Sequence, residues 1–127
     1  MSRKLDDLSP EMRPLAMELL ARCVEAGIAV IIVDTLRTPE EHAENVRRGV
    51  SWVKHSKHLD GDAIDVAPFS QYALHGPDKL QWDGDDPIWI KIGKIGEAVG
   101  LRWGGRWVHT PDLGHFELVR QPHAETD

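Results

Sequence analysis

The sequence predicts an α+β fold in which a small antiparallel sheet is flanked by helices. Two kinds of segment support this prediction. Residues 28–33 form a continuous apolar, β-branched run, and residues 62–67 and 115–118 alternate in the manner of strands. Elsewhere, apolar residues recur every three or four positions, as they do on one face of a helix. Helices that cover one face of a small antiparallel sheet define the α+β class.

The first predicted helix follows Ser9-Pro10-Glu11, where Ser9 can cap the helix and Pro10 fits its first position. Its apolar residues have helical spacing: Met12, Leu15, Ala16, Leu19, Cys23 and Ala26. Gly27 is expected to end it. Pro14 removes one early backbone donor, so we expect a distorted first turn.

Two further elements follow this helix. The β-branched run at residues 28–33 is expected to be a buried strand. The segment Thr38-Pro39-Glu40-Glu41 has the spacing of a capping box, which predicts a second helix from about Pro39 to Arg48.

In the strand predicted at residues 62–67, Ala63 and Asp65 share one face, and Ile64 and Val66 share the other. The apolar pair can enter the core while Asp65 faces a polar site. The small side chain of Ala63 leaves space beside Asp65.

The region after this strand contains a loop and a helix. Residues 69–86 contain Gly-Pro, Asp-Gly and Asp-Asp pairs, so we expect a surface loop. A helix then follows Asp86-Pro87 and ends at Gly100, with four apolar residues on one face: Ile88, Ile92, Ile95 and Val99. Gly93 and Gly96 lower its intrinsic stability, which indicates close packing against a neighbour.

The chain has 127 residues, which suits one domain spanning residues 1–127 with a single core. No apolar run approaches the ~18 residues that a membrane span needs. Residues 1–7 are charged and lack the apolar segment of a secretory leader. With Cys23 as its one cysteine, the chain is expected to be made and folded in a reducing cytoplasm.

The formal net charge is −6, from 15 basic and 21 acidic residues. Tight binding to nucleic acid or to anionic lipid relies on clustered Lys and Arg, so this balance opposes both. It opposes a metal-dependent nuclease for the same reason. We therefore expect no nucleic-acid partner and no membrane insertion, and we expect a monomer.

His58, Asp65 and His115 provide the ligand set of an open zinc site. Structural zinc is usually enclosed by four protein ligands, often cysteines, whereas catalytic zinc keeps three and leaves a position for water. Cys23 alone cannot build a cysteine-rich site. Asp112 precedes His115 by three residues, where it could handle the proton of an attacking water. The set predicts a hydrolytic Zn²⁺ enzyme.

Four motifs resemble those of the LAS-type zinc peptidases, the group of lysostaphin, D-Ala-D-Ala metallopeptidases and hedgehog-like domains. The Ser-x-His-x-x-Gly-x-Ala-x-Asp motif falls on Ser56, His58, Gly61, Ala63 and Asp65. The carboxylate-x-x-His motif falls on Asp112 and His115. Residues 36–41 and 100–107 supply the other two matches. The resemblance covers nearly the whole chain and implies a hedgehog/D,D-peptidase-like fold.

The resemblance implies zinc-dependent hydrolysis of peptidoglycan stem peptides. Asp112, which could otherwise be a turn residue, would act as general base and then general acid. The family often has Glu here; Asp is the form of phage L-alanyl-D-glutamate endopeptidases, which this chain resembles most. Arg37 could stabilise the oxyanion or clamp a substrate carboxylate, or it could be a surface residue paired with Glu40 or Glu41. Ser56 would support the site by hydrogen bonding.

Several other residues remain open. Trp103 and Trp107 could wall a substrate groove, although core packing is expected for at least one. Arg106 stands where the family often has Asp, so substrate contacts cannot be carried over there. His55 is the main rival ligand. The remaining histidines are expected at the surface: His42, His75, His109 and His123. Turn and cap roles are expected for Asp83, Asp85 and Asp86.

Two other functions stay open. A D-alanyl-D-alanine carboxypeptidase or dipeptidase would use the same ligands, and hedgehog-type relatives illustrate a zinc-bearing binding module without catalysis. Asp112 and Arg37 argue against that loss. Asp112 and the missing leader favour the phage-type endopeptidase, which would reach the cell wall after release through a holin-type pore.

Overall fold

The computed structural model describes residues 2–48, 57–69 and 83–120. These residues form the helices and strands α1 (Met12–Glu25), β1 (Val30–Asp34), α2 (Pro39–Arg47), β2 (Ala63–Pro68), α3 (Ile88–Val99), β3 (Arg102–Trp103) and β4 (His115–Glu117). Short 3-10 helices accompany them: η1 (Leu5–Asp7), η2 (Lys57–Asp60) and η3 (Gly104–Arg106). The predicted α+β class is confirmed. The sequence did not indicate the two-residue strand β3.

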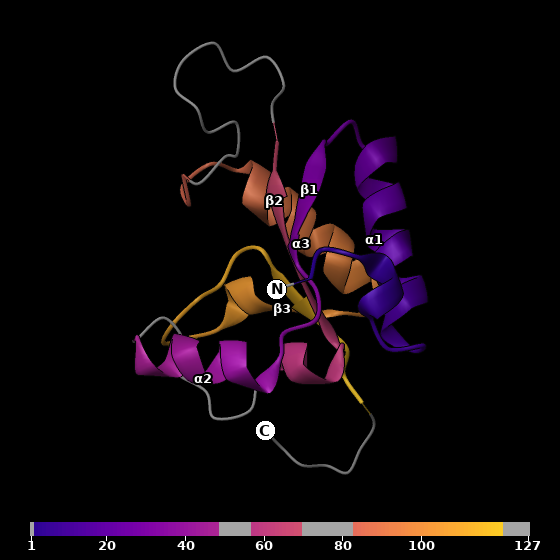
Figure 1. Cartoon of the computed structure of the whole chain (residues 1–127). Coiled ribbons are helices and arrows are strands. Elements are labelled where there is room, and N and C mark those ends of the chain that lie inside the picture. The colour runs from indigo at the N-terminus through magenta and orange to yellow at the C-terminus, as the bar shows by residue number, and fades with distance from the viewer. Residues whose placement is uncertain (1, 49–56, 70–82, 121–127) are drawn as a thin grey trace.

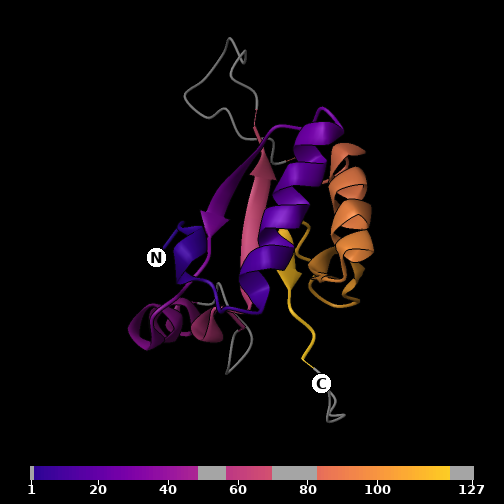
Figure 2. The same cartoon turned by 90° about the vertical axis from the view of Figure 1, so that its right-hand side faces the viewer.

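The strands form one antiparallel sheet in the order β1-β2-β4-β3. Helices α1 and α3 contact each other and pack on one face of it (Figure 1). Helix α2 lies apart from this pair, next to η2 near one end of the sheet (Figure 2). The sheet therefore has one face covered by the helix pair and one face available for other groups.

The hydrophobic core lies between α1, α3 and the covered face. Ile64 and Val66 of β2 and Phe116 of β4 point into it, and each is no more than 1% exposed. They pack with helical side chains that include Met12, Ala16, Leu19, Cys23 and Ile92. The predicted alternation along β2 is confirmed, because Asp65 lies between two core residues and faces the other way.

Helix boundaries follow their capping residues. Ser9 Oγ accepts a hydrogen bond from the backbone N–H of Met12 at 3.2 Å, but the regular helix begins at Met12 with Glu11 in the N-cap position, two residues later than predicted. Pro14 lies in the first turn, where its missing N–H removes no intrahelical bond. In α2, Thr38 and Glu41 form the predicted capping box.

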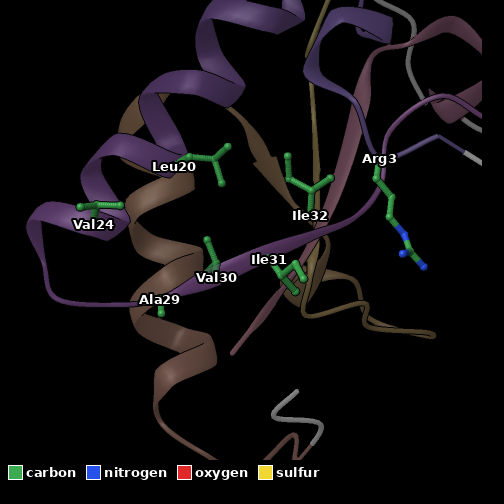
Figure 3. Close-up of a pocket in the computed structure, with 7 residues that line it drawn as sticks. All are labelled: Arg3, Leu20, Val24, Ala29, Val30, Ile31 and Ile32. Carbon is green, nitrogen blue, oxygen red and sulfur yellow. The ribbon is translucent and has the colours of Figure 1, made fainter. Parts of the chain in front are cut away.

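Strand β1 corrects one prediction, because it is an edge strand rather than a buried one. Among the strands of the described residues it pairs with β2 alone, and Ile31 is 42% exposed. Leu20 and Val24 of α1, with residues 29–32 and Arg3, line a hollow beside this edge (Figure 3). A β-branched run reports strand propensity but not the number of neighbouring strands, so the sequence could not distinguish the two cases.

The end of the predicted loop is visible before α3. Residues 70–82 lie outside the described residues. Asp83 Oδ1 accepts from the N–H of Asp85 at 3.0 Å, and Asp86 Oδ1 accepts from the N–H of Ile88 at 2.9 Å. These aspartates have the turn and cap roles that were predicted. Helix α3 ends at Gly100, which has a φ of 111°.

The two glycines of α3 permit close contact between helix and sheet. A Cβ atom at Gly96 would lie 2.3 Å from the ring of Phe116, and one at Gly93 would lie 2.4 Å from the ring of Trp103. Both rings belong to buried residues of the sheet. The close packing predicted from these glycines is confirmed.

We expect Gly96→Ala to lower the free energy of unfolding by about 1–3 kcal/mol, the typical cost of overpacking a core. Alanine is favoured over glycine in a helix by about 1 kcal/mol, so the clash with Phe116 must exceed that gain. Urea unfolding measures the difference. Lys94→Ala, on the exposed side of α3, is the matched control and should stay within about 0.5 kcal/mol of wild type. Unchanged stability of Gly96→Ala would contradict the close contact.

Candidate metal centre

The predicted ligands meet on the sheet face opposite the core. Asp65 of β2 is the cross-strand partner of His115 of β4, so their side chains share one face. His58 comes from η2. One ligand atom from each of the three residues lies within 4.8 Å of the other two. Residues separated by up to 57 positions thus form one cluster, as the sequence predicted.

The spacing of the donor atoms suits a tetrahedral metal ion. Oδ1 of Asp65 lies 2.9 Å from Nδ1 of His115 and 3.1 Å from Nε2 of His58. Ligands about 2.0–2.1 Å from a zinc ion lie roughly 3.3–3.5 Å from one another. The observed separations are only slightly shorter. Two imidazoles and one carboxylate at these distances therefore fit zinc without rearrangement of the backbone.

Each histidine ring is oriented by a hydrogen bond from the ring nitrogen that does not face Asp65. His58 Nδ1 lies 2.7 Å from the carbonyl oxygen of Thr35 and donates to it, which turns Nε2 toward Asp65. His115 Nε2 donates to Glu117 Oε1 at 2.8 Å, while Nδ1 faces Asp65. Metal-binding histidines usually have such a partner.

Sequence reasoning missed both of these partners. Thr35 acts through its backbone carbonyl, which carries no residue-type signal. Glu117 is not among the site residues that the motifs indicate. Its position two residues after His115 in an alternating strand was a usable signal, because it predicts that both side chains lie on the same face.

The ionisable groups of the cluster shift one another's pKa values. Burial would raise the pKa of Asp65, but the hydrogen bonds with His115 and His58 hold it well below its usual range. Burial would lower the pKa of His115, but hydrogen bonds to Asp65 and Glu117 raise it to about 9. The pKa of Glu117 is lowered: burial opposes this, and the bond from His115 outweighs it.

The small residues of the first motif have structural explanations. Gly61 has a φ of 73°, and its carbonyl accepts from the N–H of Ser9 at 2.9 Å. A Cβ atom there would lie 2.9 Å from that nitrogen, so the turn between η2 and β2 requires glycine. Ala63 is fully buried and is the cross-strand partner of Glu117. Its small side chain leaves room for the Glu117 carboxylate.

Asp112 lies in the turn that leads into β4. Its N–H donates to the carbonyl of Gly104 at 3.0 Å, and its own carbonyl accepts from the N–H of His115 at 3.2 Å. The residue as a whole is exposed. Partial burial of the carboxyl group, together with the charge of Asp65, raises the pKa of Asp112. The residue therefore forms the turn, and its carboxylate interacts with the charges of the cluster.

Arg37 has a partner that the sequence did not suggest. Its guanidinium lies 2.8 Å from Asp34 Oδ2, with 12% of the Arg37 side chain and 2% of the Asp34 side chain exposed. The N–H of Arg37 donates to the carbonyl of His58 at 3.1 Å. The alternative of an exposed arginine paired with Glu40 or Glu41 is wrong. A register shift between Ile32 and Asp34 turns β1 here, a change that sequence periodicity does not reveal.

The two tryptophans have different environments. Trp103 is 5% exposed, belongs to the core, and donates from Nε1 to the carbonyl of Leu113 at 2.8 Å. Trp107 is half-buried, and its ring centroid lies 5.0 Å from that of His115. Of Trp103 and Trp107, Trp107 is therefore the one that lies beside the cluster. Arg106 pairs with Glu97 at 2.8 Å and lies over the Trp103 ring.

Of the histidines predicted at the surface, two lie in the described part of the chain. His109 is exposed as expected. His42 is 4% exposed, so its prediction as a surface residue is wrong. It is the one residue of α2 that is buried, and the mostly polar sequence of this helix concealed its inward face. Ser56, His55, His75 and His123 lie outside the described residues.

Comparison with known proteins assigns the family. The sequence model of the family described as phage L-alanyl-D-glutamate peptidase matches residues 1–125. The chain belongs to this family. It is therefore a peptidase. In the part of the chain that the structure describes, no helix has the length and apolarity to cross a membrane.

Individual relatives agree with the family assignment. The L-alanyl-D-glutamate peptidase of Escherichia phage T5 is 31% identical, over 92% of this chain and 93% of its own length. That of Listeria phage A118 is 29% identical over 90% of this chain but 39% of its own length. The peptidoglycan L-alanyl-D-glutamate endopeptidase CwlK of Bacillus subtilis is 28% identical, over 89% and 74%.

A solved structure shares the fold. The L-Ala D-Glu endopeptidase ChiX of Serratia marcescens matches with a TM-score of 0.72 at 23% identity, over 91% of this chain and 83% of that chain. The α+β arrangement predicted from the sequence therefore has an experimental counterpart.

The raised pKa of His115 predicts how the stability of the metal-free protein depends on pH. Folded protein keeps a proton up to about pH 9 that the unfolded chain releases near 6.5. This stabilisation is fully present below about pH 6.5 and is lost as the pH rises through about 9. The melting temperature of chelator-treated protein should fall over this window. His115→Gln corrects for other titrating groups and should have a smaller slope. Equal slopes in the two proteins would contradict the prediction.

Proposed function

We propose that this chain is a zinc-dependent endopeptidase that cleaves the bond between L-alanine and D-glutamate in peptidoglycan stem peptides. The observation that carries the proposal is the cluster of His58, Asp65 and His115, in which both histidines are buried and both rings are already oriented by a second hydrogen bond. The L-alanyl-D-glutamate specificity for which the phage T5 and Bacillus relatives are named supports the choice of bond.

The proposed chemistry divides among a few groups. Zinc held by the three ligands would act as a Lewis acid and acidify the attacking water. Asp112 takes the proton of this water and returns it to the leaving amine. Arg37, fixed by Asp34, provides a positive charge for the oxyanion or for a substrate carboxylate.

The proposal extends to substrate and setting. Trp107, beside His115, would form one wall of the peptide groove, while Trp103 supports that wall from the core. The binding partner is the stem peptide of peptidoglycan. The protein acts as a monomer. We propose that the protein is made in a host cytoplasm and acts on the cell wall after release through a holin-type pore.

Digestion of purified peptidoglycan, followed by mass spectrometry of the muropeptides, tests this function. We expect fragments with a new amino-terminal D-glutamate, no activity after chelation, and recovery with one equivalent of Zn²⁺.

Asp112→Asn should keep zinc near one per chain and lose about 10²–10⁴-fold in rate, the usual contribution of general acid–base catalysis. Loss of zinc in this variant would make Asp112 a ligand instead of a base.

The products also distinguish the alternatives. Release of free D-alanine or of its dipeptide would identify a D-alanyl-D-alanine carboxypeptidase or dipeptidase. Intact peptidoglycan in the presence of zinc-loaded protein would identify a zinc-bearing binding module. Either result would overturn the proposed bond.

Arg37→Ala should lower turnover by about 10²–10³-fold, the typical loss for one oxyanion donor. It should also lower the free energy of unfolding by about 3–5 kcal/mol, because Asp34 would be left as an unpaired buried charge. Activity must therefore be compared per folded molecule, with folding followed by circular dichroism. Arg22→Ala, which breaks an exposed pair with Glu18, is the control. Wild-type turnover in folded Arg37→Ala would leave Arg37 with a structural role alone.

A further inference from the structure

Glu117 is a buried carboxylate to which the proposed chemistry gives no role. Its side chain is 8% exposed. Burying a carboxylate is costly unless its partners compensate. One of its oxygens, Oε1, accepts from His115 Nε2 at 2.8 Å, and the other, Oε2, lies 3.5 Å from Arg102. Both oxygens therefore have a defined partner on the polar face of the sheet.

We propose that Glu117 is a positioning residue that fixes which nitrogen of His115 binds the metal. This inference rests on the proposed zinc site. Glu117 holds the proton of His115 on Nε2 and the ring in one orientation, so that Nδ1 is left for the metal. The residue is assigned to orientation of a ligand and is not a substitute for Asp112 as the base.

The direction of the ring supports this assignment. An imidazole can rotate by half a turn and exchange its two nitrogens, and a neutral ring can carry its proton on either one. In His115, Nδ1 lies 2.9 Å from Asp65 Oδ1, within the ligand cluster. Nε2 points to Glu117. An acceptor at this position favours the proton on Nε2 and thus disfavours the exchanged orientation.

Glu117 is itself held in place. In the sheet, its neighbours across the strands are Ala63 of β2 and Arg102 of β3. Ala63 leaves the space and Arg102 supplies a positive charge, while Lys57 Nζ donates to the carbonyl of the next residue, Leu118, at 3.1 Å. A carboxylate that is buried and has Arg102 beside its second oxygen can orient a ring in a way that a mobile one cannot.

The two histidines differ in how they can be tested. His58 is oriented by the carbonyl of Thr35, which no side-chain substitution removes. His115 is oriented by the Glu117 side chain, which substitution can change. Glu117→Gln keeps an oxygen that can accept from Nε2, whereas Glu117→Ala removes the acceptor. The pair of variants therefore separates the hydrogen bond from the negative charge.

The test measures zinc affinity by competition with a chelator, on protein whose fold is verified by circular dichroism. Glu117→Ala should bind zinc about 10–100-fold more weakly, as is typical when the partner of a ligating histidine is lost. Glu117→Gln should stay within a few-fold of wild type. Glu97→Ala, which removes a carboxylate paired with Arg106, should leave affinity unchanged.

A second measurement uses wild-type protein and so does not depend on the folding of a variant. In zinc-loaded protein with ¹⁵N-labelled histidine, NMR should find the His115 proton on Nε2 and none on Nδ1. The inference is overturned if the proton is on Nδ1, if Glu117→Ala keeps wild-type affinity, or if Glu117→Gln loses as much as Glu117→Ala. Wild-type protein that binds no zinc would instead refute the proposed metal site, and this inference with it.

Discussion

The pairing of Asp65 with His115 across β2 and β4 is the interaction on which the rest of the site depends. Because the two residues are direct partners in an antiparallel ladder, backbone hydrogen bonds of the sheet set their separation. The neighbouring pair, Ile64 with Phe116, faces the core. The same register thus fixes the ligand cluster on one face and the packing against α1 and α3 on the other. A shift by one residue would lose both.

The core therefore supports the polar cluster directly, because core and cluster residues alternate along β4. Phe116 lies between His115 and Glu117 in sequence, and its ring lies so close to Gly96 that α3 cannot carry a side chain there. The backbone of β4 is held by α3 on one side and presents both polar residues on the other. Rigid elements position ligands more accurately than loops do. In this chain, two of the three proposed ligands, Asp65 and His115, are on paired strands.

The sequence predicted the parts that depend on local pattern or on residue type. The presence of the three helices, the alternation of β2 and the meeting of His58, Asp65 and His115 all have local signals, and the structure agrees with them. The sequence did not predict features set by tertiary neighbours: the edge position of β1, the burial of His42 and the pairing of Arg37 with Asp34. The hydrogen bond from His58 to Thr35 involves a backbone carbonyl, which any residue could supply.

The charges around His115 indicate why a divalent cation suits this cluster. With its pKa at about 9, His115 is protonated at neutral pH and lies between two carboxylates, Asp65 and Glu117. Counted without the neighbouring Arg102, these three side chains carry one positive and two negative charges in a poorly solvated place. A zinc ion that replaces the proton on Nδ1 would bring the same group to neutrality. Because the cation must displace a proton, binding should strengthen as the pH rises toward 9.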